Sequence, residues 1–242
     1  MLESVDIIFL RKLINAPRGT PKEIFYLEMG CIPFRELIIE RRLRFLYYIL
    51  NQKEDSMMFK FLKSQIKNKT KKDWVTAVYE DLKFLNMENT SLDEIKRMKK
   101  VSFEGKIKEI IKEKTLERLR IVKNTHSKVK DIDYEILRIQ KYLQPNQIKI
   151  SKEETQLIFK LRCRVTDIKT NMRKMYADVF CDACGLQEES QKHIIQECMK
   201  LNDNNDRSLK YEKIYDGTVG EKIEIAKRFE DNYKKLQQFR TK

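Results

Sequence analysis

Residues 180–198 read Phe180-Cys-Asp-Ala-Cys-Gly-Leu-Gln-Glu-Glu-Ser-Gln-Lys-His-Ile-Ile-Gln-Glu-Cys198 and hold three of the five cysteines and one of the two histidines of the chain. Cys181 and Cys184 form a C-x2-C pair, a spacing that lets two thiolates of one tight turn reach the same metal ion. His193 follows after eight residues and Cys198 after four more, so the four side chains have the spacing of a Cys3His site. Zinc is the expected occupant, because it takes sulfur and nitrogen ligands in a closed tetrahedral shell.

Local features of the same stretch support this interpretation. Gly185 stands where the turn after a C-x2-C pair often needs a positive φ, and a helical turn that starts near Ser190 would present His193 and Cys198 together. Four protein ligands leave no open position for water, so we expect a structural ion rather than a catalytic one. The alternative is that the cysteines are incidental thiols and that His193 is packed in a helix.

The composition favours a helical chain. Of 242 residues, 36% are charged and 41% are hydrophobic, with only six glycines and four prolines. The net charge of +14 is spread along the sequence, which points to RNA or DNA as a partner and, as the weaker alternative, to an acidic membrane surface. A lysine-rich bias of the genome would explain the same charge without such a partner.

We expect an intracellular protein, in the nucleus or the cytoplasm. No apolar run approaches the roughly twenty residues of a membrane span, and residues 1–15 lack the core and the cleavage site of a signal peptide. Cys31 and Cys163 lie in apolar or basic helix-like runs, which fits a reducing compartment better than a disulfide framework. We expect no membrane partner and no small-molecule substrate.

Helical periodicity extends through most of the chain and predicts an all-α fold. A first helix ends before Pro17, a second follows a capping box at residues 20–23 and ends near Gly30, and a third runs from Pro33 to about Gln52. Further capping signals lie at Ser56, Ser91, Ser151 and Thr218.

The helices are expected to form two regions. Residues 1–145 would be a multi-helix array, and residues 146–242 a small module stapled by zinc at residues 181–198. The C-terminal helix would dock on this module or on another chain. The hinge lies between Asn124 and Ser151, where the periodicity is interrupted and Pro145-Asn146 signals a turn. Near this hinge, residues 134–143 are interpreted as a helix and residues 147–150 as a short strand.

Basic side chains gather on the predicted helix faces. In the third helix they lie opposite an apolar side, and a solvated face is the alternative to a binding face there. That apolar side consists of Leu37, Ile38, Phe45, Leu46, Ile49 and Leu50. A lysine-rich patch at residues 67–72 precedes Trp74, which we interpret as a core residue rather than a platform for base stacking. The cations expected to point outward and contact phosphates are Arg41, Arg42, Arg44, Lys160, Arg162, Arg164, Lys169, Arg173 and Lys174.

Two parts of the sequence resemble a known family. The run Leu10-Arg-Lys-Leu-Ile-Asn-Ala-Pro-Arg-Gly-Thr-Pro-Lys-Glu-Ile-Phe-Tyr-Leu-Glu-Met-Gly-Cys-Ile-Pro-Phe34, continued by residues 41–46, resembles the segment just past the palm in reverse transcriptases of LINE-type (non-LTR) retrotransposons. Leu161-Arg-Cys-Arg164, Asn171 and the cysteine and histidine cluster are similar to the zinc-binding region that closes the polymerase part of the same family.

The resemblance implies thumb-like helices in residues 1–145, followed by a zinc-binding region that contacts RNA or DNA beside a separate polymerase domain. It also implies that this segment does not polymerise DNA alone, because the family holds two divalent ions with paired palm carboxylates. Tyr176-Ala-Asp-Val179 has one aspartate and no strand pattern around it, so we regard its likeness to the palm motif as a coincidence. The alternative function is a zinc-stapled helical module that binds another protein and has no nucleic-acid role.

Overall fold

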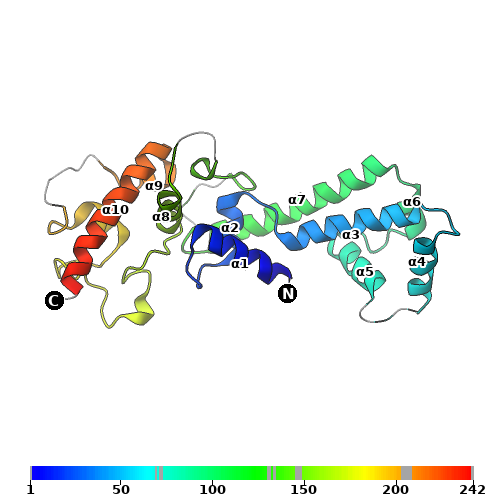
Figure 1. Cartoon of the computed structure of the whole chain (residues 1–242), viewed down its shortest axis with the longest axis horizontal. Coiled ribbons are helices and arrows are strands. Elements are labelled where there is room, and N and C mark those ends of the chain that lie inside the picture. Colours follow the sequence, from blue (N-terminus) through cyan, green and yellow to red (C-terminus); the bar gives the residue numbers. More distant parts are fainter. Residues whose placement is uncertain are drawn as a thin grey trace. The chain divides into compact units, whose positions relative to one another are not determined.

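A computed structural model of the chain describes residues 2–68, 70, 73–129, 132, 135–144, 149–202 and 209–240 (Figure 1). The described residues form helices and no strand, and an isolated antiparallel bridge pairs Phe180 with Glu188. The predicted all-α class is therefore confirmed for the part of the chain that the structure describes. None of the described helices is both long enough and apolar enough to cross a lipid bilayer.

The chain forms two compact units. Unit 1 consists of Met1–Asp6 and Ile32–Arg118, and unit 2 of Ile7–Cys31 and Leu119–Lys242. This division differs from the predicted one at residue 145, because an early segment belongs with the C-terminal half of the chain. The side chain of Phe25 in that segment stacks on Phe159 with ring centroids 5.6 Å apart, and both residues are fully buried. The expected turn at Pro145-Asn146 lies outside the described residues.

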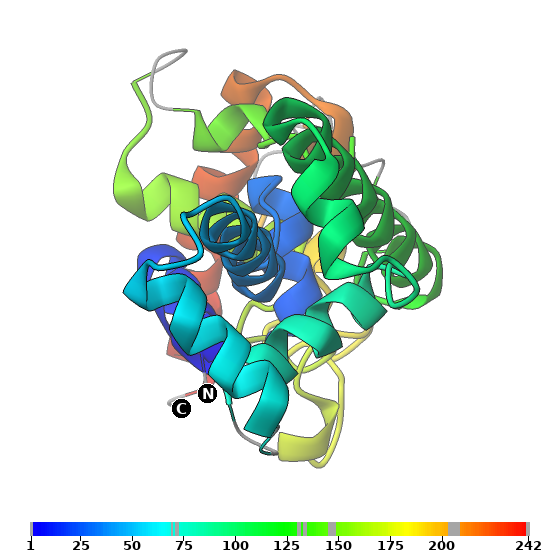
Figure 2. The same cartoon turned by 90° about the vertical axis from the view of Figure 1, so that its right-hand side faces the viewer.

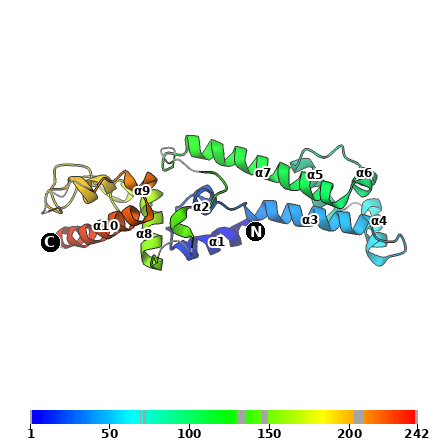
Figure 3. The same cartoon turned by 90° about the horizontal axis from the view of Figure 1, so that it is seen from above.

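Unit 1 is built on two long helices, α3 (Phe34–Leu50) and the larger part of α7 (Lys100–Thr125), which run side by side in Figures 1 and 3. The shorter helices pack against this pair, and Figure 2 views the unit nearly along α3. They are α4 (Met57–Asn68), α5 (Trp74–Phe84) and α6 (Leu92–Arg97).

The core stripe of α3 agrees only in part with the predicted one. Leu46, Ile49 and Leu50 are buried as predicted, and Ile39 and Leu43 are buried with them against side chains of the other helices. Leu37 and Phe45, which were predicted to face inward, are exposed. Both stripes satisfy helical periodicity, and the partners that pack from the other helices decide between them. Trp74 is partly buried against this core, as predicted, while most of the expected lysine patch at residues 67–72 lies outside the described residues.

Unit 2 holds the rest of the helices and the candidate site. Its elements are α1 (Leu2–Ile14), whose last two turns belong here, α2 (Lys22–Met29), η1 (Lys141–Leu143), α8 (Lys152–Arg162), η2 (Arg173–Met175), η3 (His193–Glu197), α9 (Lys213–Asp216) and α10 (Val219–Arg240). The buried faces of α8 and α10 meet in one apolar core with α2 and η3. That core is the platform on which the cysteine and histidine cluster stands.

Capping residues set most helix starts as predicted. Ser91 and Ser151 each form a complete capping box, and Thr218 exchanges the same pair of hydrogen bonds with Glu221. Ser56 accepts a hydrogen bond from the third residue after it. The capping box predicted at residues 20–23 is wrong, because α2 starts after Pro21 without a side-chain cap and the Thr20 side chain is buried instead.

Two predicted elements near the hinge change. Residue 134 lies outside the described residues, and of residues 135–143 only Lys141–Leu143 are helical, as a single 3-10 turn. Leu137 takes a positive φ of 64° that stops a helix from continuing through it. The described residues 149 and 150 are not part of a strand, and the other two residues of the predicted strand lie outside the described ones. Local periodicity was too short in both places to outweigh tertiary packing.

Gly30 ends α2 as predicted, with φ 60° and ψ 29°. A Cβ atom built on it would lie 2.2 Å from the carbonyl carbon of Arg138, so the position needs both the left-handed backbone and the missing side chain. The segment around residue 138 is therefore held directly against the end of α2.

Candidate metal centre

A tight turn presents the first two cysteines. The Cys181 amide donates to the carbonyl of Gln187 at 2.8 Å, and the Gly185 amide donates to the carbonyl of Cys181 at 2.8 Å. Gly185 has a φ of 67°, as predicted from its place after the C-x2-C pair. A Cβ atom at Gly185 would meet nothing within 4 Å, so the backbone conformation alone calls for glycine there.

A widened helical turn presents the other two side chains. His193–Glu197 is a π-helix, started by the Ser190 hydroxyl, which accepts from the His193 amide at 3.0 Å. The Cys198 amide donates to the His193 carbonyl at 2.8 Å, an i→i+5 bond. Five residues of a regular α-helix turn through about 500°, which would leave His193 and Cys198 on different faces, whereas the wider π turn brings them to one side. The expected turn near Ser190 is thus present in an unusual form.

All four predicted side chains converge. The sulfurs of Cys181, Cys184 and Cys198 and a ring nitrogen of His193 lie within 4.8 Å of one another. The Cys181 and Cys198 sulfurs are 3.9 Å apart, and Cys184 Sγ is 3.3 Å from His193 Nε2. Metal bonds of about 2.3 Å to sulfur and about 2.0 Å to nitrogen place tetrahedral ligand atoms roughly 3.5 to 3.8 Å apart. The cluster therefore has the size and the donor set to hold one metal ion.

The imidazole is oriented for coordination by a neighbour that the sequence did not indicate. His193 Nδ1 lies 2.8 Å from Gln187 Oε1, so the amide oxygen favours the tautomer that carries its proton on Nδ1 and leaves Nε2 with a lone pair toward the sulfurs. Burial lowers the pKa of His193, against an opposing influence of Glu197, which favours the neutral ring that a metal needs.

Burial also acts on the thiols. It raises the pKa of Cys181 to about 12 and raises the pKa of Cys198, although backbone amides donate hydrogen bonds toward both sulfurs. At Cys184 burial is outweighed by hydrogen bonds from the amides of Leu186 and Gln187 and from the other two thiols, so its pKa is lowered. A bound cation would favour the thiolate form at all three positions, because it supplies the compensating charge that the buried site lacks.

The C-terminal helix packs on the turn that carries His193, as predicted. Asn232 of α10 donates to the carbonyl of Ile194 at 2.8 Å and to the Asn202 side chain at 2.9 Å. Ile194, Ile195 and Cys198 belong to the same core as Phe229 and Leu236 of α10. The cluster therefore joins the loop of residues 179–202, which we call the metal loop, to a long helix.

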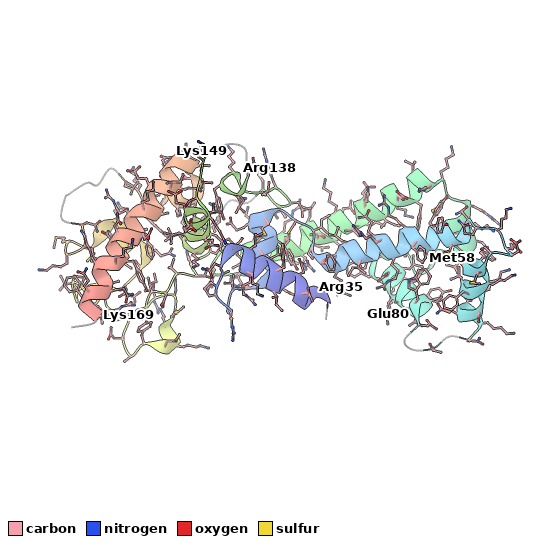
Figure 4. All side chains as sticks on the ribbon, in the orientation of Figure 1. Arg35, Met58, Glu80, Arg138, Lys149 and Lys169 are labelled. Carbon is pink, nitrogen blue, oxygen red and sulfur yellow. The ribbon has the colours of Figure 1, made fainter. Side chains whose placement is uncertain are left out.

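A network of charges supports the same loop. Lys169 lies 2.7 Å from an oxygen of Asp182 and 3.0 Å from Asp178, and Arg240 of α10 pairs with Asp182 and with Glu189. Figure 4 labels Lys169 beside the C-terminal end of α10. Lys169 is only 5% exposed, so the prediction that it points outward is wrong. Its partners come from a separate loop, which helical periodicity could not reveal.

Arg162 is the second cation that the structure turns inward. It is 1% exposed and pairs with Glu28, and its guanidinium also donates to the carbonyls of Ile214 and Tyr215 at 3.0 and 2.8 Å. Neither Arg162 nor Lys169 is placed to contact a phosphate. In unit 1, Arg42 forms an ion pair with Asp81, and Arg44 forms ion pairs with Glu40 and Glu104.

The other predicted cations lie at the surface of their own units. Arg41, Arg173 and Lys174 are exposed, and Lys160 and Arg164 are half-buried. Arg173 lies 3.0 Å from Glu188 of the metal loop. The structure thus brings Arg164 and Arg173 to the loop that carries the candidate centre, whereas Arg41 belongs to unit 1.

The fold and the cluster together define an all-α protein with a candidate Cys3His metal centre whose shell is closed by protein ligands. Comparison with protein-family models, with curated proteins and with solved structures finds no significant match.

Proposed function

We propose that this chain is a zinc-binding and nucleic-acid-binding region similar to the part of non-LTR retrotransposon reverse transcriptases that follows the palm. The observation that carries the proposal is the convergence of Cys181, Cys184, His193 and Cys198, within 4.8 Å, at the positions that the family pattern assigns to its metal ligands. The role is binding rather than catalysis, because four protein ligands leave no coordination position for a reacting water.

Zinc is the proposed ion. Three thiolates and one neutral imidazole form a soft donor set of tetrahedral size, which suits Zn²⁺ and does not suit the hard cations that prefer oxygen. All five cysteines lie among the described residues and none of them is in a disulfide, which agrees with a reducing compartment such as the nucleus or the cytoplasm.

Nucleic acid is the proposed partner, as RNA, DNA or both, beside a polymerase domain with its own palm. The chain carries a net charge of +14, and Arg164 and Arg173 line one depression together with Glu188 and Lys192 of the metal loop. The exposed Lys174 follows Arg173 in η2. Such a surface contacts phosphates without reading sequence, so affinity must fall as salt rises.

Two measurements test this function. Purified protein should contain one zinc per chain by elemental analysis, and a labelled RNA or DNA oligonucleotide should bind with an affinity that decreases linearly on a logarithmic scale of salt concentration. Absence of zinc would refute the metal assignment. Absence of binding at low salt, with zinc present, would refute the nucleic-acid role.

One observation favours a second candidate, a helical module that binds another protein. The outer face of α1 exposes Ile8, Phe9 and Leu13, with Phe9 63% exposed, and these residues follow each other at helical spacing. A protein partner on this face would bind with little dependence on salt, and Phe9→Ser would abolish that binding while leaving any oligonucleotide affinity unchanged.

A further inference from the structure

Two adjoining depressions lie on unit 2 near the metal loop. One has a volume of about 620 Å³ and the other about 500 Å³. They share Lys128, Thr170, Asn171 and Arg173 as lining residues, so they lie next to each other. The larger depression also takes residues from the metal loop itself, and we call the two together the groove.

The larger depression is cationic. Lys128, Arg164, Arg173 and Lys192 line it, and among the described residues Glu188 is its only acidic lining residue. Arg173 forms an ion pair with Glu188, and Lys192 forms ion pairs with Glu197 and Glu212, so the charges of these two cations are largely neutralised. Among the described residues, no carboxylate forms an ion pair with Lys128, and burial lowers the pKa of its ammonium group. A bound anion would compensate that charge.

Arg164 occupies a position where glycine is usual. It follows Cys163, the C-cap residue of α8, and has a φ of 52°. Its amide donates to the carbonyl of Leu161, and the Val165 amide donates to the carbonyl of Lys160, which is the Schellman pattern. A non-glycine residue is strained in this conformation. The chain therefore accepts strain at a residue that carries a guanidinium into the groove.

A chain of hydrogen bonds fixes the floor of the groove. Arg164 Nε donates to the Tyr215 hydroxyl, which lies 2.7 Å from the hydroxyl of Tyr211. Tyr211 donates to Gln191 at 2.6 Å, and Gln191 donates to Thr166 at 2.8 Å. Such a network holds polar groups in place before any ligand arrives, which lowers the entropic cost of binding.

The smaller depression is mainly apolar and contains an unsatisfied hydroxyl. Pro17, Val165, Met172 and Met175 contribute its apolar lining. Thr20 also lines it and is 3% exposed, yet its hydroxyl has no hydrogen-bond partner among the described residues. A buried polar atom without a partner points to a group that the ligand supplies.

We propose that the groove binds one nucleotide unit of a single-stranded nucleic acid, with a phosphate between Lys128 and Arg164 and an unstacked base in the apolar depression against the Thr20 hydroxyl. The proposal rests on the proposed nucleic-acid function and specifies its substrate class. A base can enter the depression only when it is free of a double helix, because stacked and paired bases do not expose their faces.

The test measures binding of the full chain, with zinc present, to a labelled single-stranded oligonucleotide and to the matching duplex. Lys128→Gln and Arg164→Gln should each weaken single-strand binding about three- to tenfold and reduce the salt slope by about one. Lys227→Gln removes an exposed lysine outside the groove and should leave both values unchanged. Thr20→Val should weaken single-strand binding alone, whereas Thr20→Ser keeps the hydroxyl and should retain affinity.

The outcomes separate the two proposals, and equal melting temperatures and zinc contents of the variants show that each folds. If the unsubstituted chain binds neither oligonucleotide, both the function and the groove are refuted. If it binds, and the Lys128 and Arg164 variants match the Lys227 control, the groove is refuted and the function stands. If Thr20→Val weakens the single strand and the duplex equally, the base site is refuted.

Discussion

Arg162 Nε lies 3.0 Å from Oε1 and 3.2 Å from Oε2 of Glu28, a residue 134 positions earlier in the chain. Tyr142 donates its hydroxyl to the same carboxylate at 2.6 Å, and all three side chains are buried. Three segments of unit 2 that are distant in sequence, α2, η1 and the end of α8, are therefore joined by one charged centre. Burial raises the pKa of Tyr142 well above its ordinary value, so this hydroxyl stays a donor.

Removal of one partner of this pair should strongly destabilise unit 2. Arg162→Met leaves the Glu28 carboxylate buried without a counter-charge, and breaking a buried pair in this way costs about 3–5 kcal/mol. Urea denaturation monitored by circular dichroism measures the loss. Arg138→Gln is the matched control, because its pair with Glu135 is exposed and such pairs contribute less than about 1 kcal/mol. Equal effects of the two substitutions would contradict the account.

Loss of the metal should loosen one part of the chain. Cys184→Ser, or a chelator added to the unsubstituted protein, removes ligands that hold residues 176–202, since binding free energy of a structural ion is folding free energy. Hydrogen exchange measured by mass spectrometry should show loss of protection there. The helices of unit 1, including α3 and α5, should keep their protection, and unchanged exchange around the cysteines would show that no structural ion is bound.

Gln187 should tune the affinity for the ion. Gln187→Ala removes the acceptor that orients the His193 ring, and loss of such an outer partner typically weakens metal binding 10- to 100-fold. Competition with a chromogenic zinc chelator measures the change. Gln187→Glu keeps an acceptor at the same place and should retain most of the affinity, so a similar loss in both variants would argue against the role of Gln187.

Asp81 in unit 1 should make stability depend on pH. Burial raises its pKa to about 6, and this effect outweighs the attraction of Arg42, whose guanidinium is 3.1 Å away. The Asp81 carboxyl then binds a proton more tightly in the folded state than in the unfolded state, where its pKa is near 3.8. The contribution of Asp81 to stability is therefore complete below pH 4 and is lost as the pH rises through 6.

Asp81→Asn should remove this dependence. At pH 7 the variant avoids burying a charge, and its free energy of unfolding should exceed that of the unsubstituted chain by up to about 3 kcal/mol, the scale of a pKa shift of this size. Urea denaturation at pH 4 and pH 7 gives the comparison. A variant that is less stable at pH 7 would show that the pairing with Arg42 outweighs burial.

Two glycines should respond in opposite directions to alanine. Gly30→Ala forces a Cβ atom against the backbone of Arg138 at a positive φ and should lower the melting temperature by several degrees. Gly105→Ala, in the helix α7, meets nothing within 4 Å and should stabilise that helix by about 0.5–1 kcal/mol. Calorimetric scans give the melting temperatures of both variants. An unchanged melting temperature of Gly30→Ala would contradict the close approach of Gly30 to the backbone of Arg138.

Local signals in the sequence determined the helix caps at Ser91, Ser151 and Thr218, the all-α class and the four side chains of the candidate metal centre. These features depend on residues within about eighteen positions of one another, where spacing alone decides which groups can meet. The π turn at His193 and the partner Gln187 had no such signal, since neither changes the spacing of the ligands.

The tertiary structure alone decided which cations are available to a ligand. Arg162 and Lys169 share a basic helical pattern with Arg164, but the carboxylates of Glu28 and Asp182 draw them inward from separate segments. Packing across long sequence separations also placed residues 7–31 in the same unit as the metal centre. A periodic pattern indicates only that one face of a helix is polar. The carboxylates that pair with cations on that face come from other segments of the fold, which the pattern does not contain.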